Sequence, residues 1–138
     1  MIVVTADTNV YISGLVFGGV PRQFLNAARV GQFRLAISAP IKAEIVRVLR
    51  DKFLWSSSAL SDLEQQMARL TVVVEPAQTI EAVPNDPDDD RIVECAVEAR
   101  AAFIVTGDND LLRLGRYGSI QIVKVATFLE MLQNATLP

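Results

Sequence analysis

Short apolar runs alternate with amphipathic stretches along the whole chain, and this alternation limits the fold more than any other feature. Runs with the length and character of buried strands lie at 2–6, 33–37, 71–74, 103–106 and 120–125. Helical patterns lie between them, at 9–15, 21–30, 39–52, 60–70, 88–100, 109–114 and 126–134. We therefore predict an α/β fold, a three-layer α/β/α sandwich with a mainly parallel central sheet.

The remaining composition indicates one compact domain. The chain has 138 residues, of which 51% are hydrophobic and 7% aromatic, so the core must be mostly aliphatic. No repeat or linker interrupts it, and we expect a single domain over residues 1–138. No apolar run is long enough to cross a bilayer, and the N-terminus lacks the pattern of a signal peptide. With the single cysteine, Cys95, these features predict a cytoplasmic protein without membrane contact.

The absence of histidine excludes several kinds of enzyme. The chain has no histidine at all, so the usual acid–base group at neutral pH is missing. Ribonucleases that use paired histidines, serine–histidine triads and histidine-ligated zinc are all excluded. Any chemistry must depend on carboxylates, hydroxyls or a bound metal.

Three carboxylates lie at positions of the predicted fold where a functional site is expected. Asp7 and Asp108 each follow an apolar strand, and ligands of open α/β sheets bind beyond the carboxyl ends of the strands. A lone strand-end aspartate is often only a helix cap. Glu44 lies at the edge of the apolar stripe of its helix, beside Ile41 and Val48, and is predicted to be half-buried. A glutamate there could also be a solvated partner of Lys or Arg.

A dense acidic run opens the helix at 88–100. Asp86, Asp88, Asp89 and Asp90 fall within five residues, which exceeds what capping a helix requires. Asp90 directly precedes the amphipathic stretch, so it is the one we expect to face the pocket, with Asp89 and Asp86 as weaker candidates. Carboxylates gathered in a cleft repel one another unless a cation neutralises them. Oxygen ligands without His or Cys favour Mg²⁺ or Mn²⁺.

Together these segments resemble the PIN-domain nucleases, and most closely the branch of toxins from toxin–antitoxin systems. The resemblance covers nearly the whole chain and rests on four elements in order. They are Asp7-Thr8-Asn9 after a strand with Phe17-Gly18-Gly19 beyond it, Glu44 on a central helix, the DPDDD run at 86–90, and TGDNDLL at 106–112.

The resemblance implies a divalent-metal-dependent endoribonuclease that leaves a 5′-phosphate and a 3′-hydroxyl. Its metal-binding and catalytic acids would be Asp7, Glu44, Asp90 and Asp108, holding two metal ions at the scissile phosphate. Asn9 and Thr106 would orient the site or the substrate, and Asp110 would be a further ligand through water. The family also implies a homodimer, an RNA substrate and, for a toxin, a blocking antitoxin protein.

Charge is compatible with an RNA partner despite a formal net charge of −3. Eight of the 16 acids belong to the expected site or its flanks, which leaves 13 bases against eight acids elsewhere, or +5. Basic residues that could follow a phosphate backbone are Arg22, Arg29, Arg34, Lys42, Arg47, Arg50 and Lys52. The apolar cluster Phe53-Leu54-Trp55 belongs either to the core or to a dimer contact.

Two other interpretations remain open. A catalytically silent module on the same fold would bind RNA or protein without metal. An aspartyl-phosphate enzyme with Asp7 as nucleophile is weaker, because no DxD motif follows the first strand.

Overall fold

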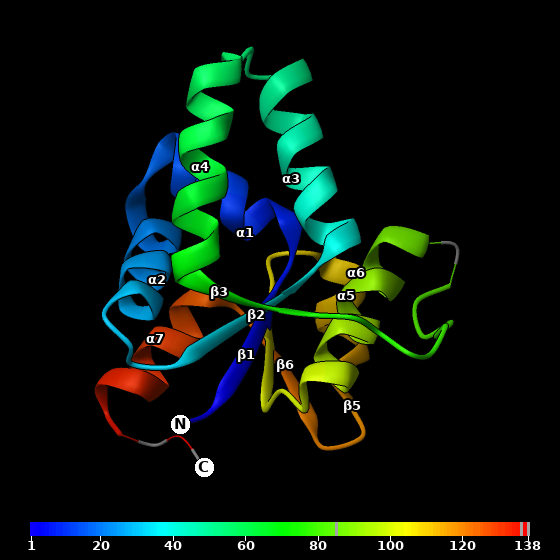
Figure 1. Cartoon of the computed structure of the whole chain (residues 1–138). Coiled ribbons are helices and arrows are strands. Elements are labelled where there is room, and N and C mark those ends of the chain that lie inside the picture. Colours follow the sequence, from blue (N-terminus) through cyan, green and yellow to red (C-terminus); the bar gives the residue numbers. More distant parts are fainter. Residues whose placement is uncertain (85, 136, 138) are drawn as a thin grey trace.

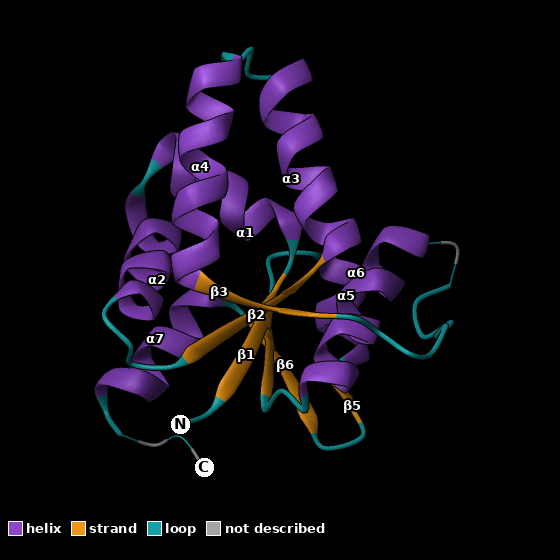
Figure 2. Cartoon of the chain, in the orientation of Figure 1, coloured by secondary structure: helices purple, strands orange, loops and turns teal. Residues whose placement is uncertain are grey.

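The computed structural model describes residues 1–84, 86–135 and 137. Strands and helices alternate as predicted (Figures 1 and 2). The strands are β1 (Val3–Ala6), β2 (Arg34–Ser38), β3 (Thr71–Val74), β4 (Phe103–Val105), β5 (Arg116–Tyr117) and β6 (Ile120–Val123). The helices are α1 (Thr8–Ile12), α2 (Gly19–Arg29), α3 (Ala39–Asp51), α4 (Ser57–Leu70), α5 (Pro87–Ala99), α6 (Asn109–Leu114) and α7 (Val125–Gln133). A π-helical turn, η1 (Ser13–Phe17), extends α1.

The six strands form one sheet in the order β3-β2-β1-β4-β6-β5. All neighbouring strands are parallel except β5 and β6, so the prediction of a mainly parallel sheet is confirmed. Figure 1 shows α5 and α6 on one side of the sheet and α2 and α7 on the other, while α3 and α4 project from it as an antiparallel pair. This is the predicted three-layer sandwich.

The core is aliphatic along the sheet and contains one aromatic cluster. Phe24 and Phe33 pack with Phe128 of α7, and Phe103 of β4 completes the group, with ring centroids 5.0 to 5.7 Å apart. All four side chains are buried. Aromatic packing of this kind adds to the hydrophobic effect, and here it fixes α2 and α7 against one face of the sheet.

The sequence pattern did not indicate β5. This strand has two residues and returns to β6 through a turn at Gly118, where φ is +59°. A two-residue strand has too few positions to show an alternation. Nowhere in residues 1–84, 86–135 or 137 is there a helix with both the length and the apolar character of a membrane span.

Candidate functional site

A hollow lined by carboxylates lies where the carboxyl ends of β1 and β4 meet. The two strands pair in parallel with Ala6 beside Val105, so the residues that follow each strand are neighbours. We call this hollow the acidic pocket. Its walls come from α1, α3, α5 and the end of β4, and it is lined by Asp7, Thr8, Asn9, Glu44, Asp86, Asp88, Asp89, Ile92 and Asp108.

Asp7 is held in place on both of its carboxylate oxygens. One oxygen accepts the backbone N–H of Val10 at 3.0 Å, which caps α1. The other accepts the hydroxyl of Thr106. The side chain is only 5% exposed, and this burial raises the pKa of Asp7, opposed by the hydrogen bond from Thr106. Asp7 therefore caps α1 and also lines the acidic pocket.

Thr106 connects the acids at the two strand ends. Its hydroxyl donates to Asp7 and accepts the backbone N–H of Asp108 at 2.9 Å. Asp108 in turn caps α6, where its Oδ1 accepts the N–H groups of Asp110 at 2.8 Å and Leu111 at 3.2 Å. Thr106 is fully buried, so it positions the acids from beneath and has no surface toward a ligand.

Glu44 reaches the pocket from α3, with 28% of its side chain exposed. The prediction of a half-buried glutamate is therefore confirmed. Burial raises the pKa of Glu44, and the nearby charge of Asp88 raises it further. Arg47 lies one turn along the helix, with Nη2 at 4.0 Å from the Glu44 carboxylate, a distance that allows only weak attraction at an exposed site.

Asp86 and Asp89 come from the start of α5. Asp86 caps this helix through a bond from the N–H of Asp89 to its carboxylate at 3.2 Å. Asp89 is 7% exposed, and its Oδ2 has no hydrogen-bond partner within the described part of the chain. Burial, together with the adjoining carboxylates of Asp86 and Asp108, raises the pKa of Asp89 to about 8. Without a cation, the Asp89 carboxyl group is therefore largely protonated near neutral pH.

The expectation that Asp90 faces the pocket is wrong. Its Oδ1 accepts the backbone N–H groups of Ala82 at 2.9 Å and Val83 at 2.8 Å, and it does not line the acidic pocket. Successive residues of a helix point about 100° apart, so only one of Asp89 and Asp90 can face Asp108. The other fastens the preceding loop. The weaker candidates, Asp86 and Asp89, line the pocket instead.

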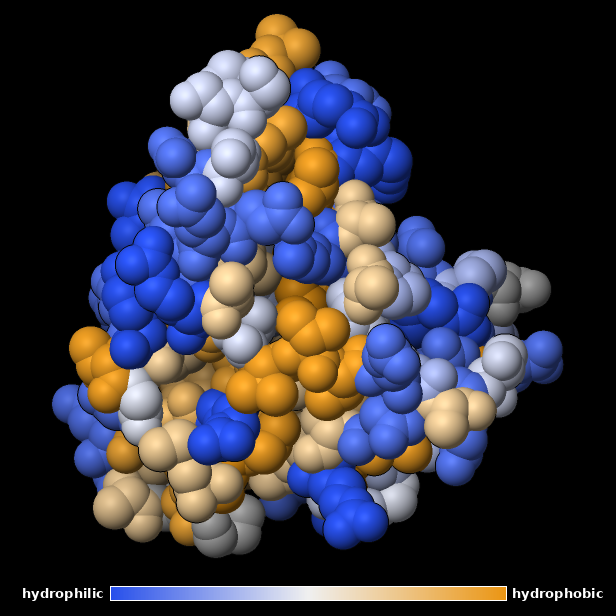
Figure 3. All heavy atoms as spheres, in the orientation of Figure 1, coloured by the Kyte–Doolittle hydropathy of each residue, from blue (hydrophilic) through white to orange (hydrophobic). Residues whose placement is uncertain are grey.

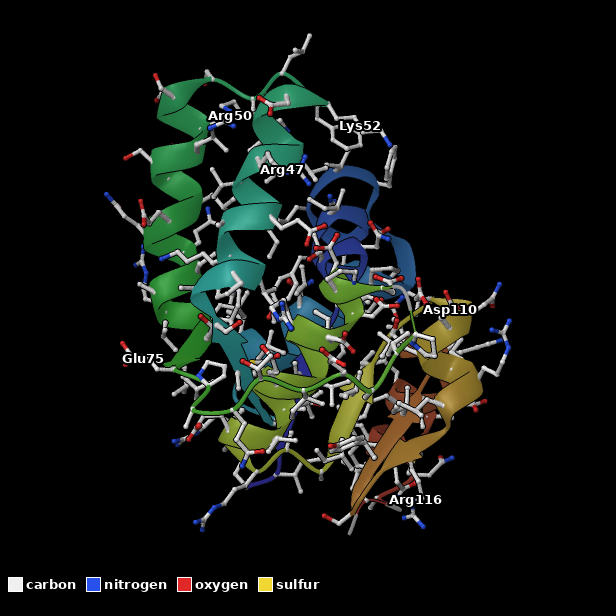
Figure 4. The ribbon with its side chains drawn as sticks, turned by 90° about the vertical axis from the view of Figure 1, so that its right-hand side faces the viewer. Arg47, Arg50, Lys52, Glu75, Asp110 and Arg116 are labelled. Atoms are coloured by element: carbon white, nitrogen blue, oxygen red, sulfur yellow. The ribbon has the colours of Figure 1, made fainter. Side chains whose placement is uncertain are left out.

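Four of the acids come close enough to share a cation. One carboxylate oxygen each from Asp86, Asp89, Asp108 and Asp110 lies within 4.8 Å of the others. Asp110 is at the exposed rim, beside Arg113 at 2.8 Å, and Figure 4 shows it on the outer side of the molecule. Asp7 and Glu44 line the same pocket but are outside this group of four oxygens. Such a set of oxygen donors suits hard divalent cations.

The other predicted residues differ in their surroundings. Asn9 is exposed at the mouth of the pocket, where it is free to meet a ligand. Thr8 and Asp88 also line the pocket, and sequence reasoning did not select either. Thr8 could have been found, because it directly follows Asp7 at the start of a helix.

Cys95 is buried beneath the site, where the Thr5 hydroxyl points to its sulfur at 3.8 Å. Burial raises the pKa of Cys95 to about 11, and its predicted place in the core is confirmed.

Basic residues continue along α3 beyond Glu44. Arg47 and Arg50 lie on its outer part and Lys52 directly follows its end (Figure 4), and all three are exposed. Arg50 is paired with Asp51 at 2.8 Å. A second hollow adjoins the acidic pocket and shares Glu44 and Asp88 with it, and Arg47 and Arg91 contribute to its lining. Positive charge therefore lies directly beside the acids.

Comparison with known proteins bears on the fold and on the family of the chain. Among solved structures, the T. brucei RRP44 PIN domain superimposes with a TM-score of 0.50 at 14% sequence identity, covering 97% of this chain and 82% of that one. At this identity the likeness concerns the fold. No curated protein sequence matches the chain. The family model for the PIN domain matches residues 3–110. The chain therefore belongs to the PIN domain family.

Proposed function

We propose that this chain is a divalent-metal-dependent endoribonuclease whose active site is the acidic pocket. The observation that carries the proposal is the group of four carboxylate oxygens, from Asp86, Asp89, Asp108 and Asp110, within 4.8 Å of one another. Membership of the PIN domain family supports it, since PIN domains are generally nucleases. The absence of histidine supports it too, because a cation would replace the missing acid–base group.

The donor atoms fit Mg²⁺ or Mn²⁺. All of them are carboxylate oxygens, and the Oδ2 of Asp89 is buried without a partner among the described residues. When Asp89 is ionised, this buried oxygen without a partner is costly, and a cation would satisfy it. Asp86, Asp89 and Asp108 would hold the ion directly, with Asp110 at the rim and Asp7 and Glu44 completing the site. When bound, the ion would activate water and offset charge on the phosphate.

The protein's own groups would orient the substrate. Asp7 cannot turn freely, because Val10 and Thr106 bond both of its oxygens. Asn9, which is exposed at the mouth of the acidic pocket, would donate a hydrogen bond to the nucleotide or accept one from it. Arg47, beside the pocket, would attract a neighbouring phosphate, and Arg50 and Lys52 would extend that attraction along α3.

The test is cleavage of a mixed RNA panel with Mg²⁺ or Mn²⁺, with and without EDTA. We expect wild type to cleave only with metal, and Asp89→Asn to lose at least about 100-fold in rate, because a charged ligand is removed. Asp62→Asn, an exposed acid on α4 outside the pocket, is the matched control. Equal cleavage by wild type and Asp89→Asn would reveal a contaminating nuclease and reject the proposal. RNA binding that survives both EDTA and Asp89→Asn, without cleavage, would favour the silent module.

Within this activity, we propose the role of toxin in a toxin–antitoxin pair. The resemblance of the segments at 86–90 and 106–112 to that branch supports it. Induced expression should then arrest growth for wild type and Asp62→Asn but not for Asp89→Asn, and co-expression of the adjacent reading frame should restore growth. Growth unaffected by an enzyme that cleaves RNA in vitro would separate the toxin role from the nuclease activity.

A further inference from the structure

The loop between β3 and α5 lies along α5, and its described residues form neither helix nor strand. We call residues 77–83 of this loop the strap. Figure 4 shows the loop leaving Glu75 and crossing α5 toward Asp110. Ile80 and Val83 of the strap are buried, while Figure 3 shows mainly hydrophilic side chains over this part of the molecule, at the right of the view. The strap therefore packs against the domain with one side and faces solvent with the other.

Three carboxylates of α5, spaced four residues apart, accept backbone N–H groups of the strap. The bonds run from Ala82 and Val83 to Asp90 at 2.9 and 2.8 Å, from Ile80 to Glu94 at 2.9 Å, and from Ala77 to Glu98 at 2.8 Å. Side chains four residues apart lie on one face of a helix, so the three acids form a row. The strap follows this row with its chain direction opposite to that of α5. Buried backbone N–H groups need acceptors, and the row supplies them.

The strap ends beside an acid of the proposed metal site. The N–H of Asp86 donates to the carbonyl of Val83 at 3.3 Å, and the Asp86 carboxylate belongs to the group of four oxygens. Of the four acids in that group, only Asp86 lies in the loop before α5. Its position therefore depends on the strap as well as on the helix that it caps.

We propose that the strap sets the affinity of the acidic pocket for its cation, and that Glu94 is the positioning residue that keeps the strap attached. This inference rests on the metal site proposed above. When the strap is detached, Asp86 is no longer held from its loop side, and the site loses a well-placed ligand. Coupling between two sites is reciprocal, so a cation bound at Asp86 would hold the strap against α5 by the same factor.

Glu94 suits this role because it is at the centre of the row and outside the pocket. It is 7% exposed, and Arg91 pairs with both of its oxygens, Nε with Oε1 and Nη2 with Oε2, each at 2.7 Å. A two-point pair of this kind fixes the plane of the carboxylate, which keeps Oε2 directed at the N–H of Ile80. Glu94 neither lines the acidic pocket nor belongs to the group of four oxygens. An effect of its substitution on metal binding is therefore indirect.

Amide hydrogen exchange measured by NMR follows the attachment of the strap. In Glu94→Ala, we expect the amide of Ile80 to exchange at least about tenfold faster than in wild type, because a bond to a charged acceptor is lost. Glu94→Gln keeps an oxygen at this place and should restore most of the protection. Glu130→Ala, at an exposed glutamate of α7, is the matched control and should leave the exchange unchanged.

Calorimetric titration with Mn²⁺ measures the consequence at the pocket. We expect Glu94→Ala to raise the Kd for Mn²⁺ at least about fivefold, Glu94→Gln to raise it much less, and Glu130→Ala not to change it. A substitution that only lowered the stability of the fold would leave the Kd of the folded protein unchanged. In wild type, saturating Mg²⁺, which does not broaden NMR signals as Mn²⁺ does, should slow the exchange of the Ile80 amide.

The outcomes separate this inference from the proposed nuclease activity. Unchanged Mn²⁺ affinity in a folded Glu94→Ala protein whose Ile80 amide has lost its protection would overturn the inference alone. Binding as weak in Glu94→Gln as in Glu94→Ala would also overturn it, because the bond to the strap would then not be the cause. A wild-type chain that takes up neither Mn²⁺ nor Mg²⁺ would reject both proposals. If Glu94→Ala fails to fold, wild type decides the case, and Ile80 exchange that Mg²⁺ does not slow would overturn the inference.

Discussion

Asp89 and Asp90 follow each other on α5 but have opposite surroundings. Asp89 faces Asp86 and Asp108 with an unpaired oxygen, whereas Asp90 accepts two backbone N–H groups from the loop before α5. The ionised form of Asp89 is unfavourable in this place without a cation, whereas the two hydrogen bonds that Asp90 accepts are favourable without any ligand. Asp89 therefore lines the acidic pocket, whereas Asp90 holds the loop before α5 against the helix.

Substitution should separate these two roles. Asp90→Ala leaves the N–H groups of Ala82 and Val83 without acceptors, and we expect the free energy of unfolding to fall by about 1 to 3 kcal/mol. Asp89→Asn should instead keep or raise the stability of the metal-free protein and abolish Mn²⁺ binding. Urea unfolding and a Mn²⁺ titration by calorimetry measure the two effects. Loss of Mn²⁺ binding in a folded Asp90→Ala protein, with binding intact in Asp89→Asn, would reverse the assignment.

Sequence reasoning found the residues whose position depends on a strand end or a helix stripe. Asp7 and Asp108 follow strands that pair with each other, and Glu44 lies at the edge of a stripe, so local rules were enough to place them. The choice between Asp89 and Asp90 depends on how the loop before α5 returns to the helix. No local pattern specifies that contact, and the prediction failed at this point.

At the scale of elements, the site depends on the alignment of β1 with β4. The two strands are joined by backbone pairing along their length and, just beyond their ends, by the hydroxyl of Thr106 between Asp7 and Asp108. The strands themselves could be predicted, since each is a continuous apolar run. Thr106 was expected to orient the site or the substrate. Its hydroxyl donates a hydrogen bond to Asp7 and accepts one from the N–H of Asp108, and both bonds hold these acids in position.

Thr106→Val should loosen this connection while preserving the shape of the side chain. Asp7 would lose a hydrogen bond in a buried place, and the N–H of Asp108 would lose its acceptor, so we expect the free energy of unfolding to fall by about 1 to 3 kcal/mol. Cleavage should slow because Asp7 keeps only the hydrogen bond from Val10 and is held less firmly, with a larger effect on kcat than on KM. Thr127→Val, at an exposed threonine of α7, controls for the change of residue type. An unchanged kcat in Thr106→Val would show that Asp7 needs no such support.

For the whole molecule, the acidic pocket is a local cost to folding that a bound cation would remove. Asp7, Glu44 and Asp89 all have pKa values raised by burial, so each resists ionisation in the folded chain. The fold tolerates them because the elements that form the pocket walls also bury apolar side chains in the core, among them Val10, Ile45 and Val93, and this burial offsets the cost. Stability and pH are therefore linked through these three carboxyl groups, of which Asp89 also belongs to the proposed metal site.

The metal-free protein should lose stability as pH rises from about 5 to about 8. A carboxyl group whose pKa is higher in the folded state than in the unfolded state binds more protons when folded, so its contribution is complete below the unfolded pKa. The contribution is lost as pH rises toward the folded value, which for Asp89 is about 8. We expect a fall of at least about 1 kcal/mol, or about 4 °C in Tm for a chain of this size.

Mn²⁺ should reverse this dependence, because it binds the ionised carboxylates and displaces their protons. Thermal unfolding in EDTA and in millimolar Mn²⁺ would show metal stabilisation that grows with pH in wild type and in Asp62→Asn. In Asp89→Asn the fall in EDTA should become shallower, because one titrating group is gone, and the gain from Mn²⁺ should disappear. A Tm in EDTA that rises from about pH 5 to about pH 8 would mean that these carboxyl groups are already ionised without strain. The pocket would then need no cation, and the physical basis of a metal site here would be lost.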